Sequence, residues 1–214
     1  MKKMLISIML ITGLFAQSNM TLVGMTLVGG INYSTIAGDD IDDAENLRGF
    51  RFGIQKKLEN GLIGGVTYSQ RGYSISEKNS YYDNYYGDVT EEIKTKFKVN
   101  YLTAYVLKPI PMETEIDFFV GGELGYFMSA ELKLRASYKD DAEDYTDSET
   151  MDFDGDDWDD IDGNKLDYGF VFSGRYTINS QMSIVGTYYF GLAELTDATD
   201  AKNRSFQINL AYGL

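Results

Sequence analysis

The residues best able to do chemistry in this sequence are the carboxylates crowded between positions 140 and 162. Thirteen aspartates and glutamates lie there, without a lysine or arginine among them. Calcium takes six to eight oxygen ligands, so closely spaced carboxylates can bind it. The spacing does not fit an EF-hand loop, because the sixth position from Asp152 is Asp157 rather than glycine. The candidate calcium ligands are Asp152, Asp154, Asp156, Asp157, Asp160 and Asp162.

The alternative for this acidic stretch is a solvated loop whose charges repel one another. Its only tryptophan, Trp158, could anchor a partner or pack onto the rim of a folded domain. Four tyrosines further upstream could extend an aromatic girdle or form a contact surface; they are Tyr81, Tyr82, Tyr85 and Tyr86. Neither aromatic group identifies a ligand.

Enzymatic chemistry has little support in the composition. Histidine and cysteine are both absent, which removes Ser-His-Asp and Cys-His catalysis and histidine-ligated zinc. Carboxylate pairs could act as acid and base, but no serine lies in a recognisable nucleophile setting. We expect a protein that is not an enzyme and has no cofactor other than the calcium considered above.

Net charge also limits the partners. The chain carries a formal charge of -14 and a pI near 4.3. Nucleic acids and anionic phospholipids both attract basic surfaces, so neither is expected as a partner. Outside the acidic stretch the sequence is close to neutral.

Alternation with a period of two residues is the main structural signal. Residues 206–214 alternate between large apolar side chains and polar or small ones. Successive side chains of a strand point to opposite faces, so this segment has one apolar face. The same pattern predicts eight strands, at residues 25–33, 49–57, 62–73, 93–107, 116–136, 166–178, 182–192 and 204–214.

One strand carries apolar residues in both alternating sets. In the strand at 93–107 we assign the apolar face to Phe97, Val99, Tyr101 and Tyr105. The far half stays ambiguous, because Leu102, Ala104 and Val106 are apolar as well.

The start of the chain predicts a secretory signal peptide at residues 1–18, with Lys2 and Lys3 before an apolar run and small residues at the cleavage site. The mature chain, 19–214, then forms one domain. No later segment approaches the roughly 18 consecutive apolar residues of a transmembrane helix. A soluble secreted β-protein is the alternative; it explains the alternation but not the 17 tyrosines and 12 phenylalanines.

Connections between the predicted strands alternate in length. Those after the first, third, fifth and seventh strands span about 10 to 28 residues, and the others about 3 to 8, which is typical of extracellular loops and periplasmic turns. The sequence thus predicts an all-β fold, a closed eight-stranded antiparallel transmembrane β-barrel with short periplasmic turns and long extracellular loops. The acidic extracellular loop is residues 139–165.

The interior of an eight-stranded barrel is about filled by side chains, and charges buried there need partners. We therefore expect an interlocked charge network in the lumen, with a narrow ion path through the same residues as the alternative. Its expected members are Arg51, Arg71, Asp117, Glu123, Glu131, Lys133, Arg135, Asp167 and Arg175.

Several short segments, in order along the mature chain, resemble the PorT-like outer-membrane β-barrel family common in Bacteroidetes-type bacteria. They are GGINYST at 29–35, YSQRG at 68–72, NYL at 100–102, GGELGY at 121–126, LDYG at 166–169, GL at 191–192 and KNR at 202–204. Members often carry a proline where this chain has Tyr105, and often end in an aromatic residue where it has Leu214. The resemblance implies the barrel fold and an outer-membrane location, and leaves the activity open.

We expect a non-enzymatic integral outer-membrane protein of a Gram-negative-type envelope, with its signal peptide removed and its lumen filled. It would display acidic and aromatic loops in a structural or binding role. The alternative is a small channel or an accessory component of a protein secretion or transport system. Expected partners are outer-membrane lipids, the outer-membrane assembly machinery during biogenesis, and an extracellular or envelope protein; the protein is expected to be a monomer.

Overall fold

The computed structural model describes residues 24–38, 44–83, 85–139, 144–160, 163–196 and 199–214, so the predicted signal peptide lies outside the described residues. Within them the fold is all-β, with nine strands and one short helix. The strands are β1 Met25–Ala37, β2 Glu45–Lys57, β3 Ile63–Asp83, β4 Gly87–Ile110, β5 Ile116–Lys139, β6 Asp144–Phe153, β7 Leu166–Thr177, β8 Met182–Thr196 and β9 Thr199–Gly213, and the helix is α2 Gly155–Asp160.

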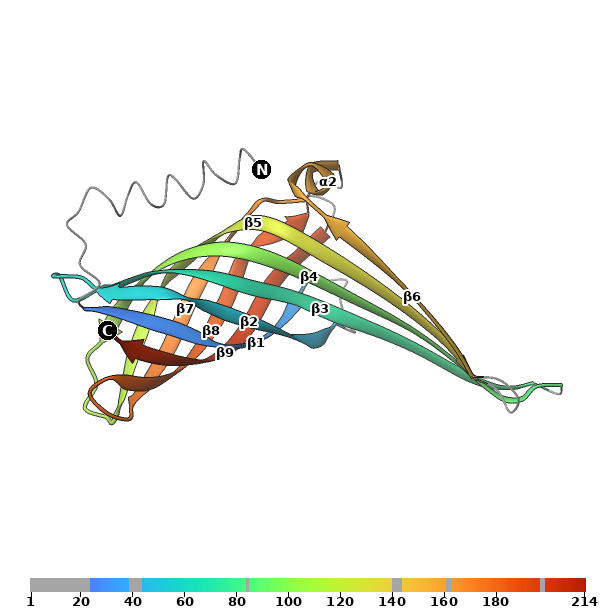
Figure 1. The fold of residues 1–214 in the computed structure, drawn as a ribbon, viewed down its shortest axis with the longest axis horizontal. Coiled ribbons are helices and arrows are strands. Elements are labelled where there is room, and N and C mark those ends of the chain that lie inside the picture. Colours follow the sequence, from blue (N-terminus) through green and yellow to red (C-terminus); the bar gives the residue numbers. More distant parts are fainter. Residues whose placement is uncertain (1–23, 39–43, 84, 140–143, 161–162, 197–198) are drawn as a thin grey trace.

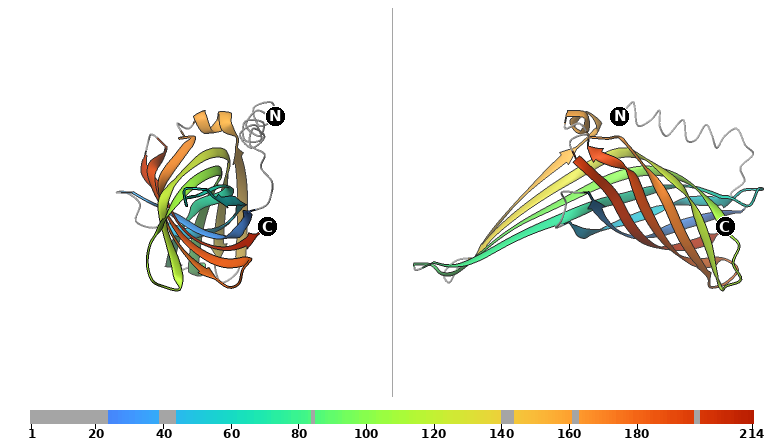
Figure 2. Two further views of the ribbon diagram at one scale, coloured as in Figure 1. Left: turned by 90° about the vertical axis from the view of Figure 1, so that its left-hand side faces the viewer. Right: turned by 180° about the vertical axis from the view of Figure 1, so that it is seen from behind.

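Eight of these strands close into a ring, which is visible end-on in Figure 2. Neighbours along the chain pair antiparallel from β1 to β5, β5 pairs with β7, and β9 returns to β1 through pairs such as Ile31↔Ile208. This confirms the predicted closed, eight-stranded antiparallel barrel. All eight predicted strands are present, although several extend further than the hydrophobic alternation indicated.

Three short turns, at residues 58–62, 111–115 and 178–181, lie at one end of the barrel, which we call the turn end. Gly61 has a φ of 83° there and follows Asn60, whose side chain accepts a hydrogen bond from the Leu62 backbone at 3.1 Å. An Asn-Gly pair is well suited to a tight hairpin because both residues tolerate positive φ. The Leu214 backbone N–H also donates to the Met25 carbonyl at this end, so the last strand is tied to the first.

At the other end, four strands continue beyond the ring as a projecting sheet (Figure 1). We call it the arm; it consists of residues 74–83 of β3, 87–98 of β4, 130–139 of β5, and β6. β6 pairs only with the far half of β5, whereas the near half of β5 pairs with β7. The segment 139–165, expected as a loop, therefore contains β6 and α2.

The tyrosine-rich connection between β3 and β4 is also mostly strand. Pairing continues without interruption to Asp83↔Gly87, where the sequence predicted a loop from about residue 74 to 92. The reason is physical: a strand with water on both faces needs no apolar alternation, so the search for one apolar face does not detect it. Its threonine and tyrosine residues still favour extended structure.

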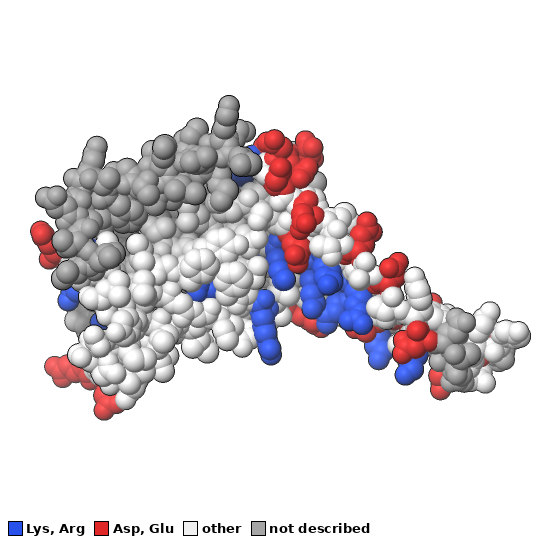
Figure 3. Space-filling model, in the orientation of Figure 1, with Lys and Arg blue, Asp and Glu red and all other residues white. Residues whose placement is uncertain are grey.

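Large apolar side chains point outward from every ring strand. In the arm-side half of the barrel, the rings of Phe50, Phe52 and Tyr68 stack on one another with centroids 5.3 to 6.0 Å apart. Figure 3 shows a broad uncharged surface over the barrel, with charged residues gathered on the arm and at the turn end. Exposed outward residues include Leu27, Ile31, Val106, Leu124, Tyr126, Phe170, Phe172, Tyr188, Phe190, Ile208 and Leu210.

Candidate functional site

A chain of ion pairs fills the centre of the barrel interior. Arg71 on β3 is 1% exposed; its Nη2 donates to Glu123 and its Nη1 donates to Asp167 Oδ2 at 2.5 Å. Glu123 also accepts a hydrogen bond from Arg51 Nη2 at 2.7 Å. Two arginines and two carboxylates from β2, β3, β5 and β7 thus balance one another, and the ion pairs link strands that are not neighbours in the ring.

Neutral side chains make further hydrogen bonds with both the carboxylates and the arginines of this network. The Tyr189 hydroxyl donates to Asp167 Oδ1 at 2.7 Å, and Asn203 Nδ2 donates to Asp167 Oδ2 at 2.9 Å. Gln207 Oε1 accepts from Arg51 Nη1 at 2.6 Å. Burying a charge costs several kcal/mol unless it is paired and hydrogen-bonded. These partners explain how four charged groups are retained where water is excluded.

Aromatic rings cover the faces of both guanidinium groups. The Arg71 guanidinium carbon lies 3.8 Å from the centroid of the Tyr189 ring and 5.5 Å from that of Tyr101. The Arg51 guanidinium carbon lies 5.0 Å from the centroid of the Tyr105 ring. A cation within about 6 Å of a ring face is stabilised by the ring quadrupole. The interior is therefore a mixed ionic and aromatic plug.

Towards the turn end, apolar side chains replace the charges. Buried Ile63, Leu107, Phe119 and Val171 pack beneath Tyr105. A cavity beside Arg51 has a volume of about 30 Å³, which has room for about one water molecule. Packing of this kind leaves no wide path between the network and the turn end.

At the arm end, Trp158 caps the interior. This residue of α2 is fully buried. Its ring stacks on Phe127, with centroids 4.4 Å apart and planes inclined by 15°, and on Phe97 at 5.8 Å and 13°. Its Nε1 donates to the Asn164 carbonyl at 3.1 Å. Of the two roles predicted for Trp158, the structure shows packing onto the barrel rim.

Carboxylates hold the helix that carries this tryptophan. Asp154 Oδ1 accepts hydrogen bonds from the backbone N–H of Asp156 at 2.8 Å and of Asp157 at 3.2 Å, and Asp157 Oδ2 accepts from the Asp154 N–H at 3.1 Å. This reciprocal pattern is that of a helix capping box.

A hydrogen bond to Asp159 raises the pKa of Lys165 just after the helix.

The structure does not bring the candidate calcium ligands into one site. Asp152 ends β6, Asp154 and Asp157 cap α2, and Asp160 ends the helix. Asp162 lies outside the described residues. In the described part of the chain, no group of three or more carboxylates is arranged to hold a metal ion. Calcium binding stays a prediction.

Of the nine residues predicted for the lumen network, Arg51, Arg71, Glu123 and Asp167 lie together in the interior. Asp117 and Arg175 pair with each other instead, at 2.7 Å, in the turn-end mouth. Their side chains are 53% and 32% exposed, so this pair is solvated and separate from the buried network.

The structure corrects the placement of Glu131, Lys133 and Arg135, which lie on the outer face of the arm. They pair with Lys98, Lys96 and Lys94 of β4. These even-numbered residues lie on the same outward face of β4 as the exposed Val106. A β-bulge is the cause: Asn100 is opposite Ser129 but Tyr101 is opposite Phe127, leaving Met128 as an extra residue. One extra residue moves every later side chain to the opposite face.

For β4 the predicted inward and outward faces were reversed. Tyr101 and Tyr105, predicted on the apolar face, point into the barrel. Tyr101 is fully buried beside Arg71, and the Tyr105 hydroxyl donates to Gln55 at 2.8 Å. The other set of β4, which includes Val106, faces outward. The tyrosine hydroxyl groups could have indicated the correct face. When both alternating sets of a strand are apolar, the set whose side chains end in a polar group suits a polar interior.

Sequence reasoning did not single out Tyr189, Asn203 and Gln207 for the network. Tyr189 and Gln207 belong to the interior sets of their predicted strands, whereas Asn203 lies one residue before the predicted strand at 204–214. Which of them reach the charged groups depends on the stagger of the ring, which no local pattern gives.

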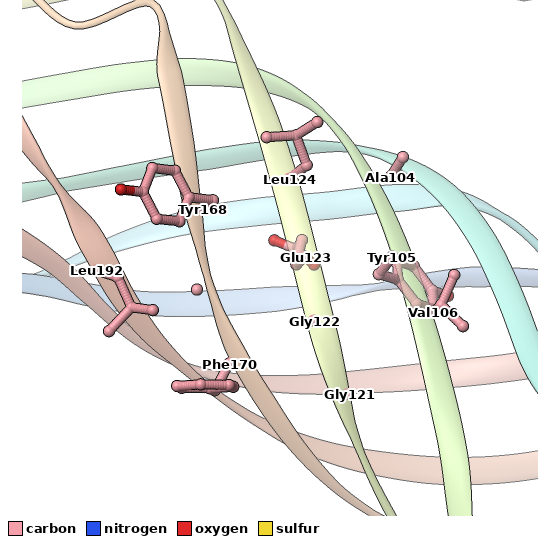
Figure 4. A pocket seen from close by; sticks show the side chains of 11 residues that line it. Ala104, Tyr105, Val106, Gly121, Gly122, Glu123, Leu124, Tyr168, Phe170 and Leu192 are labelled. Carbon is pink, nitrogen blue, oxygen red and sulfur yellow. The ribbon is translucent and has the colours of Figure 1, made fainter.

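Outside the barrel, a shallow groove lies over Gly122 (Figure 4). Its rim is formed by Leu124, Tyr168, Phe170 and Leu192, and its volume is about 530 Å³. Because glycine has no side chain, the outer surface is indented there. The groove is part of the apolar outer face, whereas Glu123 belongs to the interior network.

None of the helices in the described residues is long and apolar enough to cross a membrane.

Comparison with solved structures supports the barrel fold. The chain resembles Neisserial surface protein A, with a TM-score of 0.50, 13% sequence identity, and coverage of 89% of this chain and 97% of that one. It also matches Ail, the attachment invasion locus protein of Yersinia pestis, with a TM-score of 0.47, 15% identity, and coverage of 90% and 99%. No protein-family model and no curated protein sequence matches the chain. At these identities the likeness to the neisserial protein extends to the fold, and membership of the PorT-like family stays a prediction.

Proposed function

We propose that this chain is an integral outer-membrane protein. The support is the inversion of its surfaces: large apolar side chains face outward from all eight ring strands, while four charged groups are buried inside. A soluble protein rarely exposes a continuous apolar patch of this kind, whereas a membrane barrel needs an apolar band flanked by aromatic residues. The stacked rings of Phe50, Phe52 and Tyr68 would form part of such a girdle.

The barrel in this proposal is a non-enzymatic anchor and not a pore. The observation that carries it is the closed interior, in which Arg71, Glu123 and Asp167 are paired and Trp158 covers the arm-end mouth. No polar path and no nucleophile with an activating base is part of that arrangement. The protein would be a monomer, and it would belong to the family of PorT-like barrels.

The arm would be the functional surface. Its interior-facing side continues the barrel wall, and α2 packs over its base, where Trp158 stacks on Phe97. Exposed apolar and aromatic side chains lie there, among them Tyr81, Ile93, Tyr145 and Met151. A sheet face of this type suits contact with an envelope or extracellular protein. The proposed role is therefore display of a binding surface outside the membrane, on a sheet fixed to the barrel by continuous strands.

Membrane insertion is tested by fractionation and by electrophoresis of the mature chain with and without boiling. The proposal expects outer-membrane recovery and a faster-migrating folded form that is lost on boiling. Recovery as a soluble periplasmic species would contradict it.

The anchor role is tested by conductance in planar bilayers. The purified protein should give no steady single-channel current, because paired side chains and Trp158 close the interior. Steady currents from the wild-type protein, altered by the substitution Arg71→Gln, would overturn the closed-lumen proposal and favour a channel.

A further inference from the structure

The base of the arm carries a basic hollow on its outer face. It has a volume of about 430 Å³ and is lined by five basic residues and two carboxylates. Figure 3 shows basic residues gathered where the arm leaves the uncharged barrel surface. On a chain with a net charge of -14, such a surface is a local exception. Its charged lining residues are Glu45, Arg48, Lys94, Lys96, Lys98, Glu131 and Lys133.

The register gives the height of this hollow above the apolar band. Tyr68, Leu102 and Tyr126 lie opposite one another on β3, β4 and β5. The next outward row is polar: Gln70 donates to Asn100 at 3.2 Å, and Asn100 donates to Ser129 at 2.9 Å. The row of Lys98 and Glu131 follows, and then the row of Lys96 and Lys133.

Lys98 is four residues beyond Leu102, which at about 3.3 Å per residue is roughly 13 Å along the strand. With a strand tilt of about 40°, that is roughly 10 Å of height. If Leu102 lies at the edge of the hydrocarbon core, the backbone of Lys98 lies roughly 2 to 5 Å beyond the lipid headgroup layer, which adds roughly 5 to 8 Å on each side of a bilayer. Lysine side chains can extend along the surface and reach back into such a layer.

The charges in the hollow are poorly compensated by the protein itself. Lys96 is directly opposite Lys133, and Lys94 is directly opposite Arg135. Like charges in such cross-strand pairs are destabilising. Glu45 lies 3.9 Å from Lys94 and Glu131 lies 3.4 Å from Lys98.

Lys96, Lys133 and Arg135 have no carboxylate within ion-pair distance among the described residues. The fold therefore keeps two successive cross-strand pairs of like charge, Lys96 with Lys133 and Lys94 with Arg135, and an external anion would relieve the repulsion in both.

We propose that this basic hollow binds phosphate groups of a membrane lipid headgroup, of the phosphorylated glycolipid type, in the leaflet on the arm side. Charge complementarity and continuity with the apolar face support this occupant: acyl chains contact Leu102 and Tyr126 while phosphates contact Lys96, Lys98 and Lys133. A free phosphate ion would gain nothing from that continuity. The inference rests on the proposed membrane location.

The test uses the full mature protein in detergent, titrated with lipid A that carries two phosphates and followed by native mass spectrometry. One variant combines Lys96→Gln, Lys98→Gln and Lys133→Gln. A matched control combines Lys56→Gln, Lys57→Gln and Lys108→Gln, which removes the same charge at the turn end. Each lysine near an anionic membrane surface strengthens binding roughly fivefold, so the first variant should bind about 100-fold more weakly and the control as the wild type does.

Two further measurements identify the source of the phosphate. Lipid A stripped of its phosphates should bind much more weakly, and excess inorganic phosphate should not displace the intact lipid. Equal binding by both triple variants, undiminished binding of the dephosphorylated lipid, or displacement by inorganic phosphate would each overturn the inference. Heat-modifiable migration is measured on every variant, so failure of the barrel proposal is seen separately from failure of lipid binding.

Discussion

The rings of Trp158 and Phe127 lie almost parallel, 4.4 Å apart, and join a helix outside the barrel ring to the interior wall of β5. Because Phe97 also stacks on this indole, a segment rich in carboxylates is held over the barrel mouth by aromatic contacts. The carboxylates of α2 face solvent, and the one large apolar side chain of this helix, Trp158, closes the interior.

Replacing Trp158 with alanine should release α2 from the mouth. Loss of a fully buried tryptophan costs about 3 to 5 kcal/mol, more than so short a helix can recover by itself. We expect rapid proteolysis within residues 144–165 while the ring remains heat-modifiable. Trp158→Phe, which keeps a stacking ring, should stay largely protected; equal cleavage of both variants and the wild type would contradict the cap.

The wild-type protein provides a second check on the same contact. Trp158 is the only tryptophan, so the intrinsic fluorescence reports on this site alone. Its emission should be blue-shifted and poorly quenched by acrylamide. An emission spectrum of exposed tryptophan in the folded barrel would contradict the stacked arrangement.

Arg71→Met should destabilise the barrel strongly. It leaves Glu123 with only Arg51 and leaves Asp167 without a cation, and breaking a buried ion pair in this way costs about 3 to 5 kcal/mol. The midpoint of the heat-modifiable transition should fall clearly. The matched control is Arg175→Met, whose partner Asp117 is half exposed; an exposed pair contributes about 0 to 1 kcal/mol. Equal midpoints for the two variants would show that the interior network does not stabilise the barrel.

Single cysteines can test which end of the barrel faces outward, because the chain has none of its own. Tyr145→Cys on the arm should react with a membrane-impermeant maleimide on intact cells. Lys57→Cys near the turn end should react only after the outer membrane is permeabilised, and Leu124→Cys should stay unreactive within lipid. The opposite order for Tyr145 and Lys57 would reverse the proposed orientation.

The ring could be predicted from sequence because eight segments alternate with a period of two residues, and the pairing Ile31↔Ile208 joins the first strand to the last as the count requires. The arm could not, because strands exposed on both faces leave no such signal: Ser80 and Thr90, on adjacent strands, are both solvated and hydrogen-bonded to each other. Solvated strands and loops have similar compositions, so only the pairing distinguishes them.

The interior network could be predicted up to Glu123 and no further along β5. Before the bulge, odd-numbered residues such as Glu123 and Phe127 are buried; after it, the even-numbered Ala130 is buried. The sequence alternates on both sides of Met128, so the alternation gives no sign of the bulge there. Its effect is that Leu132 faces inward and Glu131 faces outward. Local alternation fixes the two sets of side chains but not which set faces inward.

Deletion of Met128 tests this argument directly. Without the extra residue, the far half of β5 would turn over and direct Glu131 and Lys133 towards Phe97 and the mouth, while Leu132 would face outward. The unfavourable burial of charge should displace Trp158, with a red-shifted emission and increased quenching by acrylamide. Deletion of Glu113, in the turn between β4 and β5, removes one residue without altering strand register and should leave the emission unchanged. An unchanged spectrum in the Met128 deletion would mean that the bulge does not determine which face of β5 packs beneath the cap.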